Sequence, residues 1–546
     1  MGGVTVVSGV SNPGDVTTIS GMSIIHTGVV LVDFNGPTPP SGDNYYFAFL
    51  TPNLGVGAFG NANPDGTYTT FEYDTSTPGT FTYRLITNAA DGSIASAKTI
   101  DTAFFNNTAK DTSNNIYNIN GNLNKLTSSY SPVSTVAPNG APPGFYTPVC
   151  GQVYGTGLNS IGIDSSGNLW INAVPNAYWP CCCHCYCLPT IPNYASTIDK
   201  FNTSLSPVNV YYVPFNPWTC TIPPACCGGY LSISPYYTTS GFVTSYTGSA
   251  YSTYQIFSLN VTIQNSYTCN ISYEQVQEII VWQPSVNTNI TRYLFRSSLT
   301  SAWGSSYFVQ LRDLKRNPVT GTGIALITCP NYATNLLPIW EIVPGSGPVL
   351  RTGFLFKDTL GLSGAGIAQA QITCDSSGNI YILINVLDSQ GTDLGFKIYI
   401  AKLNSSFVLQ WQRVLSLTSP ALDSTSGISY SVFDISSSTS KPGLAITGSI
   451  SYPIGGNNYA GSPPFVMTVP FDGSLTQTFS IVGNSTTFTL SYAVASSARM
   501  QTVSAAASVY ASTYTSALTA GSLPMTSATT PTVTPASGYS STVKIL

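Results

Sequence analysis

Charged residues are scarce in this sequence. Lysine, arginine, aspartate and glutamate together make up 7% of its 546 residues, where ordinary soluble domains have roughly 25%. The net charge is −4, which gives no basic footprint for nucleic acid. Hydrophobic residues reach 43%, too many for a chain kept disordered by charge repulsion. The surface must therefore be solvated by Ser, Thr, Asn, Tyr and backbone groups, which suits extracellular or particle-forming proteins better than cytosolic enzymes.

Histidine is nearly absent as well, since only His26 and His184 occur. The sequence contains no HExxH, GxSxG or P-loop motif, so we expect neither an enzyme nor a cofactor. One enzyme class stays open as an alternative. A glycosidase needs only two carboxylates about 5 to 10 Å apart, and Glu274 with Glu278 is one pair in the sequence that could serve.

Long apolar runs are missing too. The longest, such as NIYILINVL, have the length of a strand and fall short of the roughly 18 residues of a membrane span. The opening MGGVTVVSGVSNPGD lacks the basic start and apolar centre of a secretory signal. We expect no membrane span, and either a removed signal or release by cell lysis, as happens to viral structural proteins.

Helical periodicity is scarce, and 48 Gly and 37 Pro argue against long helices. Short aromatic and β-branched runs alternate with clusters of Gly, Pro, Asn and Ser from end to end. One segment, SYEQVQEIIVW at residues 272–282, could hold a short helix but suits a strand equally well. The sequence predicts an all-β protein.

Three segments of the chain share one pattern. Each begins with a polar turn and a strand, in DTSNNIYNI, DSSGNLWIN and DSSGNIYIL at residues 111–119, 164–172 and 375–383. Each continues with a second strand that carries Lys, a large apolar residue and small hydroxyl residues, in LNKLTSSYSPV, IDKFNTSLSPV and IAKLNSSFVLQW. Weaker copies extend the series to about nine units, and a spacing of roughly 50 residues with several short strands per unit is typical of propeller blades.

We therefore predict a β-propeller of about seven to nine blades over residues 1–483, with residues 1–60 as a candidate separate N-terminal β module. The residues from 484 onward are rich in Ala, Ser and Thr, with Pro near the end. Such a composition cannot build a core of its own. Residues 484–546 are thus predicted to form a C-terminal arm, as a linker, a stalk or a segment that orders against partners.

The Asp residues that open the repeats are predicted to close turns. Asp and Asn side chains bond the backbone of such turns, and Gly or Asn supplies a positive φ. SIGIDSSGNLW also resembles the Asp-box turn of sialidases and other propellers, although it is one residue too long between Asp164 and Gly167. A structural role is expected for Asp164 and Asp375. Calcium binding is the alternative, but no dense loop of oxygen ligands such as D-x-D-x-D-G is present.

One unit carries a family resemblance. DSSGNIYIL with IYIAKLNSSFVLQWQRVL, from Asp375 to Leu415, resembles the β-propeller repeats of structural proteins from tailed bacteriophages, particularly marine and cyanobacterial phages. In that family an AKLNSSG-x-x-x-WQR strand recurs, and a C-terminal tract of Ser, Ala, Leu and Thr is common, which residues 498–530 resemble. The match is close over one unit, partial over two more and loose elsewhere. It implies a virion component, in the tail or a tail appendage, and names no catalytic residue.

Cysteine is concentrated in one part of the chain. Eight of the twelve cysteines lie in two short segments: Cys181, Cys182, Cys183, Cys185, Cys187, Cys220, Cys226 and Cys227. Against the repeats, the first segment falls between the two strands of the second repeat, which makes it an insertion at a blade edge. The isolated cysteines, which are expected to be buried small hydrophobes, are Cys150, Cys269, Cys329 and Cys374.

Three interpretations of the clustered cysteines stay open. We favour a disulfide-stapled loop involving the eight clustered residues, because it suits the Pro-rich context and needs only the oxidising setting of a released virion. The second is a zinc site on Cys183, His184, Cys185 and Cys187, although CCCHCYC lacks the usual C-x₂₋₄-C pairs. The third is free thiols or cross-links between subunits.

These features predict a virion structural protein, located in the extracellular particle as part of the tail or a tail appendage, that serves assembly, host-receptor contact or both. Its expected partners are other virion proteins, further copies of itself, and a host surface receptor or glycan. The 34 tyrosines suit such contacts because they give area at low entropic cost. The alternatives are a secreted or cell-surface adhesion propeller and a glycan-degrading tail enzyme.

Overall fold

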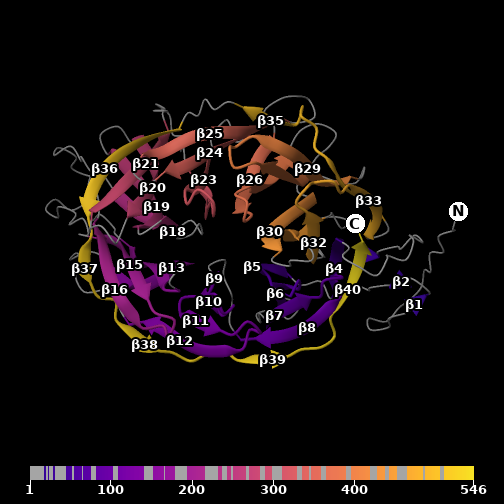
Figure 1. Cartoon of the computed structure of the whole chain (residues 1–546), viewed down its shortest axis with the longest axis horizontal. Helices are drawn as coiled ribbons and strands as arrows, with labels where there is room; N and C mark the ends of the chain where they lie inside the picture. The colour runs from indigo at the N-terminus through magenta and orange to yellow at the C-terminus, as the bar shows by residue number, and fades with distance from the viewer. Residues whose placement is uncertain are drawn as a thin grey trace.

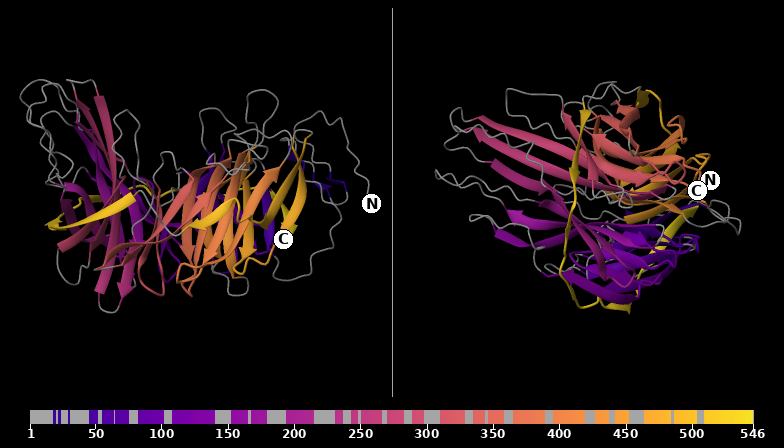
Figure 2. Two further views of the ribbon diagram at one scale, coloured as in Figure 1. Left: turned by 90° about the horizontal axis from the view of Figure 1, so that it is seen from above. Right: turned by 60° about the vertical axis from the view of Figure 1, so that its left-hand side comes forward.

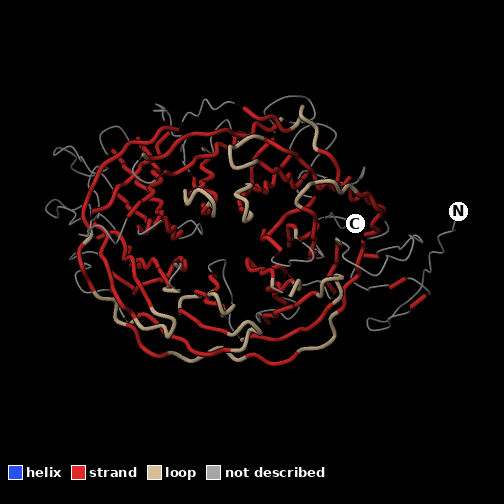
Figure 3. Tube along the Cα trace, in the orientation of Figure 1, coloured by secondary structure: helices blue, strands red, loops and turns tan. Residues whose placement is uncertain are grey.

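The fold is that of a computed structural model of the chain. The described residues are 18–19, 22–23, 29–30, 45–51, 55–63, 65–74, 82–101, 108–139, 152–164, 167–178, 194–214, 231–236, 243–247, 250–265, 270–282, 289–297, 310–328, 335–343, 346–357, 365–388, 395–418, 427–436, 442–451, 464–483, 486–503 and 509–545. Their regular structure is β-strand throughout, and no helix occurs among them (Figure 3). The all-β prediction is confirmed, and SYEQVQEIIVW belongs to strand β20 (Asn270–Trp282).

The strands form antiparallel groups that stand side by side in a ring, the arrangement of a β-propeller (Figure 1). Five groups are separate sheets, each a blade. The β5–β8 blade contains β5 (Gly55–Ala62), β6 (Tyr68–Asp74), β7 (Thr82–Asn88) and β8 (Ile94–Ile100). The β9–β12 blade contains β9 (Thr108–Lys110), β10 (Ile116–Ile119), β11 (Leu123–Leu126) and β12 (Pro132–Pro138). The β13–β16 blade contains β13 (Gln152–Ile163), β14 (Leu169–Tyr178), β15 (Tyr194–Phe201) and β16 (Pro207–Pro214).

Two more blades complete this set. The β17–β21 blade contains β17 (Leu231–Tyr236), β18 (Val243–Thr247), β19 (Ala250–Asn265), β20 and β21 (Asn289–Ser297). The β22–β25 blade contains β22 (Gln310–Arg316), β23 (Gly323–Thr328), β24 (Leu336–Val343) and β25 (Gly347–Phe356). A small sheet outside the ring pairs β1 (Thr18–Ile19) with β2 (Met22–Ser23).

The remaining ring strands share one twelve-stranded sheet. Its first group contains β26 (Ala365–Cys374), β27 (Ile380–Asp388), β28 (Gly395–Leu403), β29 (Leu409–Thr418), β33 (Gln477–Gly483) and β3 (Val29–Val30). Its second group contains β30 (Gly427–Ser436), β31 (Gly443–Ser451), β32 (Pro464–Pro470) and β4 (Tyr46–Thr51). One parallel pair, Phe396 with Gly427, joins the two groups.

Glycine is required at this junction. Gly427 has a φ of +126°, and a Cβ there would lie 2.3 Å from the carbonyl oxygen of Phe396. The prediction of seven to nine blades is therefore wrong when each blade is counted as a separate sheet. Five blades stand alone, and the other two groups of strands are merged by this close backbone contact.

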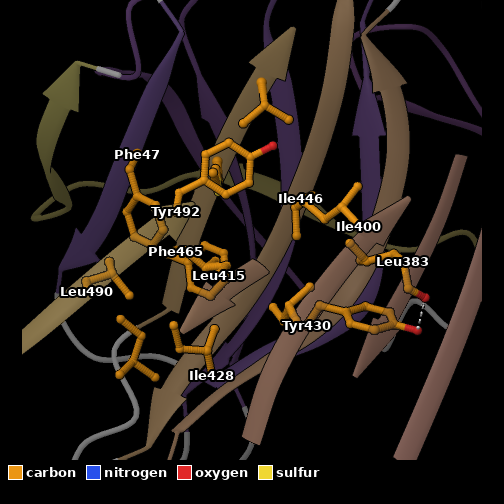
Figure 4. Close-up of a cluster of buried hydrophobic side chains, with 14 of the residues drawn as sticks. Phe47, Leu383, Ile400, Leu415, Ile428, Tyr430, Ile446, Phe465, Leu490 and Tyr492 are labelled. Carbon is orange, nitrogen blue, oxygen red and sulfur yellow. Dashed lines mark hydrogen bonds between the residues drawn. The ribbon is translucent and has the colours of Figure 1, made fainter. Parts of the chain in front are cut away.

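A strand from the N-terminal part of the chain closes the ring. β4 pairs with β32 through Phe49–Phe465, Ala48–Val466 and Phe47–Met467. The rings of Phe47 and Phe465 stack with centroids 4.7 Å apart, in the core drawn in Figure 4. Residues 46–51, which fall in the segment considered as a separate module at 1–60, thus complete the group of β30 to β32.

The C-terminal segment runs round the outside of the ring, and we name residues 486–503 and 509–545 the C-terminal belt. Its strands are β34 (Thr486–Val494), β35 (Met500–Val503), β36 (Val509–Ala517), β37 (Thr519–Gly521), β38 (Met525–Ser527), β39 (Val533–Pro535) and β40 (Ser540–Ile545). In that order they pair antiparallel with β29, β25, β21, β16, β12, β8 and β4. The belt therefore contributes a strand to every group, as the outermost strand in six of them, while in the seventh β34 lies between β29 and β33 (Figures 1 and 2). The C-terminal arm predicted at 484–546 lies against its own chain along this path.

Isolated apolar side chains anchor the belt between blades. Leu518 is buried in a cluster with Trp170 of the β13–β16 blade and Trp282 of the β17–β21 blade. Leu523 is buried in the next cluster, which includes Tyr212 of β16. These leucines fill the junctions between neighbouring blades, so the belt also links blade to blade.

A buried charge cluster fixes the start of the belt. Arg499, between β34 and β35, contacts the Asp388 carboxylate at the end of β27. The same carboxylate oxygen accepts from Lys397 Nζ at 2.6 Å, and the Asp388 and Lys397 side chains are 1% and 3% exposed. Without Arg499, the negative charge of the buried Asp388 carboxylate would be balanced by Lys397 alone. This contact therefore ties the belt to the core.

The three repeats form the turns that the sequence predicts. In the third, Asp375 Oδ1 accepts from the backbone amides of Ser377 and Asn379, each at 2.9 Å. Its Oδ2 accepts from Asn379 Nδ2 at 2.8 Å and from the Tyr381 hydroxyl at 2.9 Å. Asp111 and Asp164 make corresponding bonds to the residues four and six positions later. These carboxylates close turns with donors from their own loop, which supports the structural role over calcium binding.

An aromatic ring and a lysine stack on each other in every one of these repeats. The pairs lie directly opposite on neighbouring strands: Tyr117 with Lys125, Trp170 with Lys200, and Tyr381 with Lys402. Each ammonium lies 5.4 to 5.7 Å from the ring centroid, within the range of a cation–π contact. The repeat therefore has one unit of Asp, aromatic and Lys that fills the space beside the turn.

The scarce charges also link the inner strands of neighbouring groups. Arg312 Nη1 of β22 donates to a carbonyl of β26 at 2.9 Å, and Asp313 accepts the Ile372 amide of β26 at 2.9 Å. Asp434 of β30 accepts the Ala62 amide of β5 at 3.0 Å. Only 7% of the residues are charged, and several of these charged side chains form hydrogen bonds between neighbouring groups of strands.

Candidate functional site

The clustered cysteines lie outside the described residues, and so do His26 and His184. The strand ends that flank them are described. Tyr194, which follows the first segment, pairs with Pro214, which precedes the second. Residues 179–193 and 215–230 therefore leave from neighbouring strand ends of the β13–β16 blade, and the first connects β14 to β15. The disulfide and zinc interpretations stay predictions.

Cys374 is the one candidate thiol within the described ranges. It is free and packs against the core around β27. Burial, with the Asp375 charge as a smaller cause, raises the pKa of this thiol to about 12. A thiol that stays protonated is a poor nucleophile. Cys374 is half-buried beside the core, which agrees in part with the expectation of a buried small hydrophobic residue.

The carboxylate pair considered for a glycosidase is unfavourably placed. Glu274 and Glu278 lie four residues apart in the single extended strand β20. At the rise of an extended strand their Cα atoms are about 13 Å apart. This backbone spacing is wider than the separation of two carboxylates that act on one glycosidic bond.

A polar pocket lies between the β5–β8 and β9–β12 blades, with a volume of about 380 Å³. It opens beside the turns at residues 63–67, 111–115 and 127–131. Leu85 and Ile116, each 1% exposed, contribute apolar lining. Most other lining groups are hydroxyls, amides and two lysines, and they lie beside the apolar cluster of this junction, which includes Phe71, Leu126 and Tyr130.

A ladder of small polar side chains crosses one wall of the pocket. Asn61, Thr69, Thr87 and Ser96 lie directly opposite one another on β5, β6, β7 and β8. The Oγ1 atoms of Thr69 and Thr87 share a hydrogen bond of 2.9 Å. Asn61 Nδ2 donates to the Tyr130 hydroxyl of the neighbouring blade at 2.9 Å. The ladder presents both donors and acceptors toward the pocket.

The charges of the pocket are two lysines and one carboxylate. Lys110 Nζ donates to the Ala62 carbonyl at 2.6 Å, and Lys98 donates to the Ser129 carbonyl. Burial lowers the pKa of Lys110, although the Asp434 charge opposes this. Burial raises the pKa of Tyr130 to about 12, so its hydroxyl remains protonated.

The carboxylate of Asp65 is occupied within its own turn. Its Oδ1 accepts from the Thr67 amide at 3.0 Å and from the Thr67 hydroxyl at 2.7 Å. Asp65 is the single acidic residue among those that line the pocket. This geometry offers binding groups for a polar ligand, but not the pair of carboxylates that glycoside cleavage requires.

Neither a family model nor a curated protein matches the chain. Three solved structures align with the chain at low similarity. BBS1N in complex with ARL6DN has a TM-score of 0.35 and 10% identity, with 81% of this chain and 97% of that chain covered. A subtype N11 neuraminidase-like protein from a flat-faced bat H18N11 strain has a TM-score of 0.26 and 11% identity, with 82% and 95% covered. A structural genomics protein of unknown function from Bacteroides thetaiotaomicron has a TM-score of 0.16 and 9% identity, with 77% and 98% covered.

At these TM-scores the three similarities carry no argument about function. Within the described ranges no three His, Cys, Asp or Glu side chains gather as a metal site would require, but the predicted zinc ligands lie outside those ranges. In the same part of the chain no helix is long and apolar enough to cross a membrane.

Proposed function

We propose that the protein is a structural component of a virus particle, in the tail or a tail appendage, that contacts other virion proteins and a host surface receptor or glycan. The observation that carries this proposal is the C-terminal belt. An uncovered outer strand offers its N–H and C=O groups to any neighbouring strand. Copies packed in a particle lie at very high local concentration, where such edges would pair wrongly. The belt strands are the outermost strands of six groups, and four of them, β35, β37, β38 and β39, have only three or four residues each. Such short edges offer little for a neighbouring strand to pair with, which leaves contacts to be made by loops and side chains.

The belt also suits persistence outside the cell. A blade can leave the ring only if its belt strand separates as well, and the belt pairs with all the groups in succession. Such a barrier slows unfolding, and a released particle depends on this because no chaperone can refold it. The resemblance to phage propeller repeats supports the same role, since the Asp, aromatic and Lys residues of those repeats form the turns of this fold.

The test is the composition of purified particles. Mass spectrometry of virions purified through a density gradient is expected to detect peptides from both the blades and the belt. Detection of the chain in the cell-surface fraction instead, with a processed signal on a longer precursor, would contradict the proposal and favour an adhesion propeller.

A further inference from the structure

We propose that the pocket between the β5–β8 and β9–β12 blades binds a single acidic sugar unit, a monosaccharide that carries a carboxylate. The idea that this sugar belongs to a host glycan rests on the proposed function. Binding of the sugar by the purified protein does not depend on that function, so the sugar site and the proposed function can be tested separately.

The turn at residues 63–67 has the two backbone hydrogen bonds of the Asp turns in the repeats. Asn63 N donates to the Thr67 carbonyl at 2.9 Å, as Asp111 N does to the Asn115 carbonyl at 3.1 Å. Asn63 Nδ2 donates to the Thr67 and Thr69 hydroxyls, at the positions from which Asn115 and Tyr117 donate to the Asp111 carboxylate, so the partners correspond although the direction is reversed. Thr69 therefore holds the position that an aromatic ring holds in the repeats.

The same comparison identifies the partner position. The turn from Ala89 to Ser93 has the backbone hydrogen bonds of the turn from Thr127 to Ser131. Counting back two residues from each turn places Thr87 where the next blade has Lys125. Thr69 and Thr87 are also directly opposite each other, as the ring and the lysine are in the repeats.

The pocket exists because two threonines replace an aromatic–lysine stack. In the β9–β12 blade the ring of Tyr117 and the chain of Lys125 occupy this space and close the junction. In the β5–β8 blade the shorter side chains leave about 380 Å³ open. The turn and the strand register are the same in both blades. The difference is therefore local: two short hydroxyl side chains stand where the next blade has a large ring and a long lysine.

The groups that line this space fit a sugar acid. Thr87 and Ser96 of the ladder supply donors and acceptors for hydroxyl groups, since Asn61 and Thr69 are buried and bonded within the protein. Leu85 with Ile116 supplies an apolar contact for ring carbons. The ammonium groups of Lys98 and Lys110 outnumber the single carboxylate, Asp65, and favour an anionic substituent. A volume of about 380 Å³ is near the lower end of small-molecule sites and suits one sugar ring rather than a chain.

The first experiment compares three probes on the full chain by ligand-observed NMR and calorimetry. D-galacturonate is expected to bind saturably with a Kd of about 1 mM, and D-galactose about tenfold more weakly because it lacks the carboxylate. Acetate, which has the carboxylate alone, is expected to show no saturable binding. No binding of galacturonate, equal binding of galactose, or equal binding of acetate would each overturn the proposal.

The second experiment fills the pocket. Thr69→Tyr combined with Thr87→Lys restores the stack of the neighbouring blade, so galacturonate binding is expected to be lost while the melting temperature stays within a few degrees of the original. If the double variant fails to fold, Lys98→Gln replaces it and is expected to lower galacturonate affinity about tenfold without changing galactose affinity. Full binding by either folded variant would overturn the site.

Lys125→Gln is the matched control. Lys125 and Lys98 each donate to a turn carbonyl of the next blade, but Lys125 does not line the pocket. Its replacement should leave galacturonate binding unchanged. If purified virions lack this chain, the proposed function is contradicted but the sugar site is not. If virions contain the chain but the purified protein does not bind galacturonate, only the sugar site is contradicted.

Discussion

The blades and the C-terminal belt are both built of strands, but different forces hold them. In β27, eight of the nine side chains are buried. In β37, all three belt residues are exposed, although the strand pairs with β16 through its whole length. The blades are thus held by packed cores, and the belt strands β37 to β39 by main-chain hydrogen bonds with neighbouring anchors such as Leu518 and Leu523. The start of the belt differs, because Phe488, Leu490 and Tyr492 of β34 are buried in the core drawn in Figure 4. A segment that cannot build a core can still be ordered by the edges of a sheet.

Removing the belt should have the largest effect. A chain that ends at Gly483 uncovers seven partner strands and also removes Phe488, Leu490 and Tyr492 from a blade core, so we expect loss of more than about 15 °C in melting temperature, or aggregation through the exposed edges. Calorimetry and size-exclusion chromatography measure both effects. A chain that ends at Ser527 loses only β39 and β40, and its melting temperature should lie between those of the full chain and the chain that ends at Gly483. Equal stability of all three chains would show that the belt contributes nothing.

A buried carboxyl within a blade should give the next effect. Burial raises the pKa of Glu72 to about 8, although a hydrogen bond from Thr70 opposes this, and the ordinary value is 4.5. The folded state therefore holds the proton more tightly, and stability falls as the pH rises from about 4.5 to about 8. Glu72→Gln should be about 3 kcal/mol more stable than the original chain at pH 8 and equal to it below pH 4.5.

Urea unfolding at several pH values between 4.5 and 8 measures this difference, because other titrating groups are shared by both chains. The belt is intact in both, so the pH dependence isolates the blade. An unchanged pH slope in Glu72→Gln would contradict the burial of a protonated carboxyl at this position.

The charged anchor of the belt should contribute less than the whole belt. Arg499→Ala leaves the Asp388 carboxylate buried with Lys397 as its remaining ion-pair partner, and we expect a loss of about 2 to 3 kcal/mol in urea unfolding. Arg351→Ala is the matched control, since its side chain is 41% exposed in the pair with Glu341. That pair should contribute less than about 1 kcal/mol. Equal losses in the two variants would remove the special role of Arg499.

A single turn should give the smallest effect. Asp375→Ala removes the acceptor of four hydrogen bonds, but the turn lies at the surface, so about 1 to 2 kcal/mol is expected. Denaturant unfolding measures it. Asp375→Asn keeps one amide oxygen as acceptor and should lose about half as much. A loss of stability as large as that caused by truncating the belt would contradict the expectation that one turn contributes less than the belt.

Sequence predicted the parts of the fold that side chains determine. The Asp turns, the buried strands and the all-β class follow from residue types and their spacing. The blade count was wrong because a backbone contact at Gly427 merges two groups, and a glycine in a loop-rich sequence gives no sign of its neighbour. The path of the belt was not predictable either, since Ser, Ala and Thr pair through the backbone and carry no pattern that selects a partner strand.

The pocket could have been found from sequence in part. NPDGTYT, residues 63–69, has the turn spacing of DTSNNIY, and the alignment places Thr69 at the position of an aromatic residue. In this blade the repeat signature lies in the second strand, TYRLITNAADGS at residues 82–93, so the exchange in the preceding strand gives no signal of its own. The opposite threonine, Thr87, becomes visible once the register of β6 and β7 is known.

Hydrogen exchange of the intact protein, followed by mass spectrometry, tests most directly that the belt is a part of the closed ring. In β36 and β40 the amides that bond β21 and β4 are predicted to exchange as slowly as the amides of those partner strands, and to be released with them in one cooperative step. Belt peptides that exchange at the rate of an unfolded chain, beside protected blades, would contradict it.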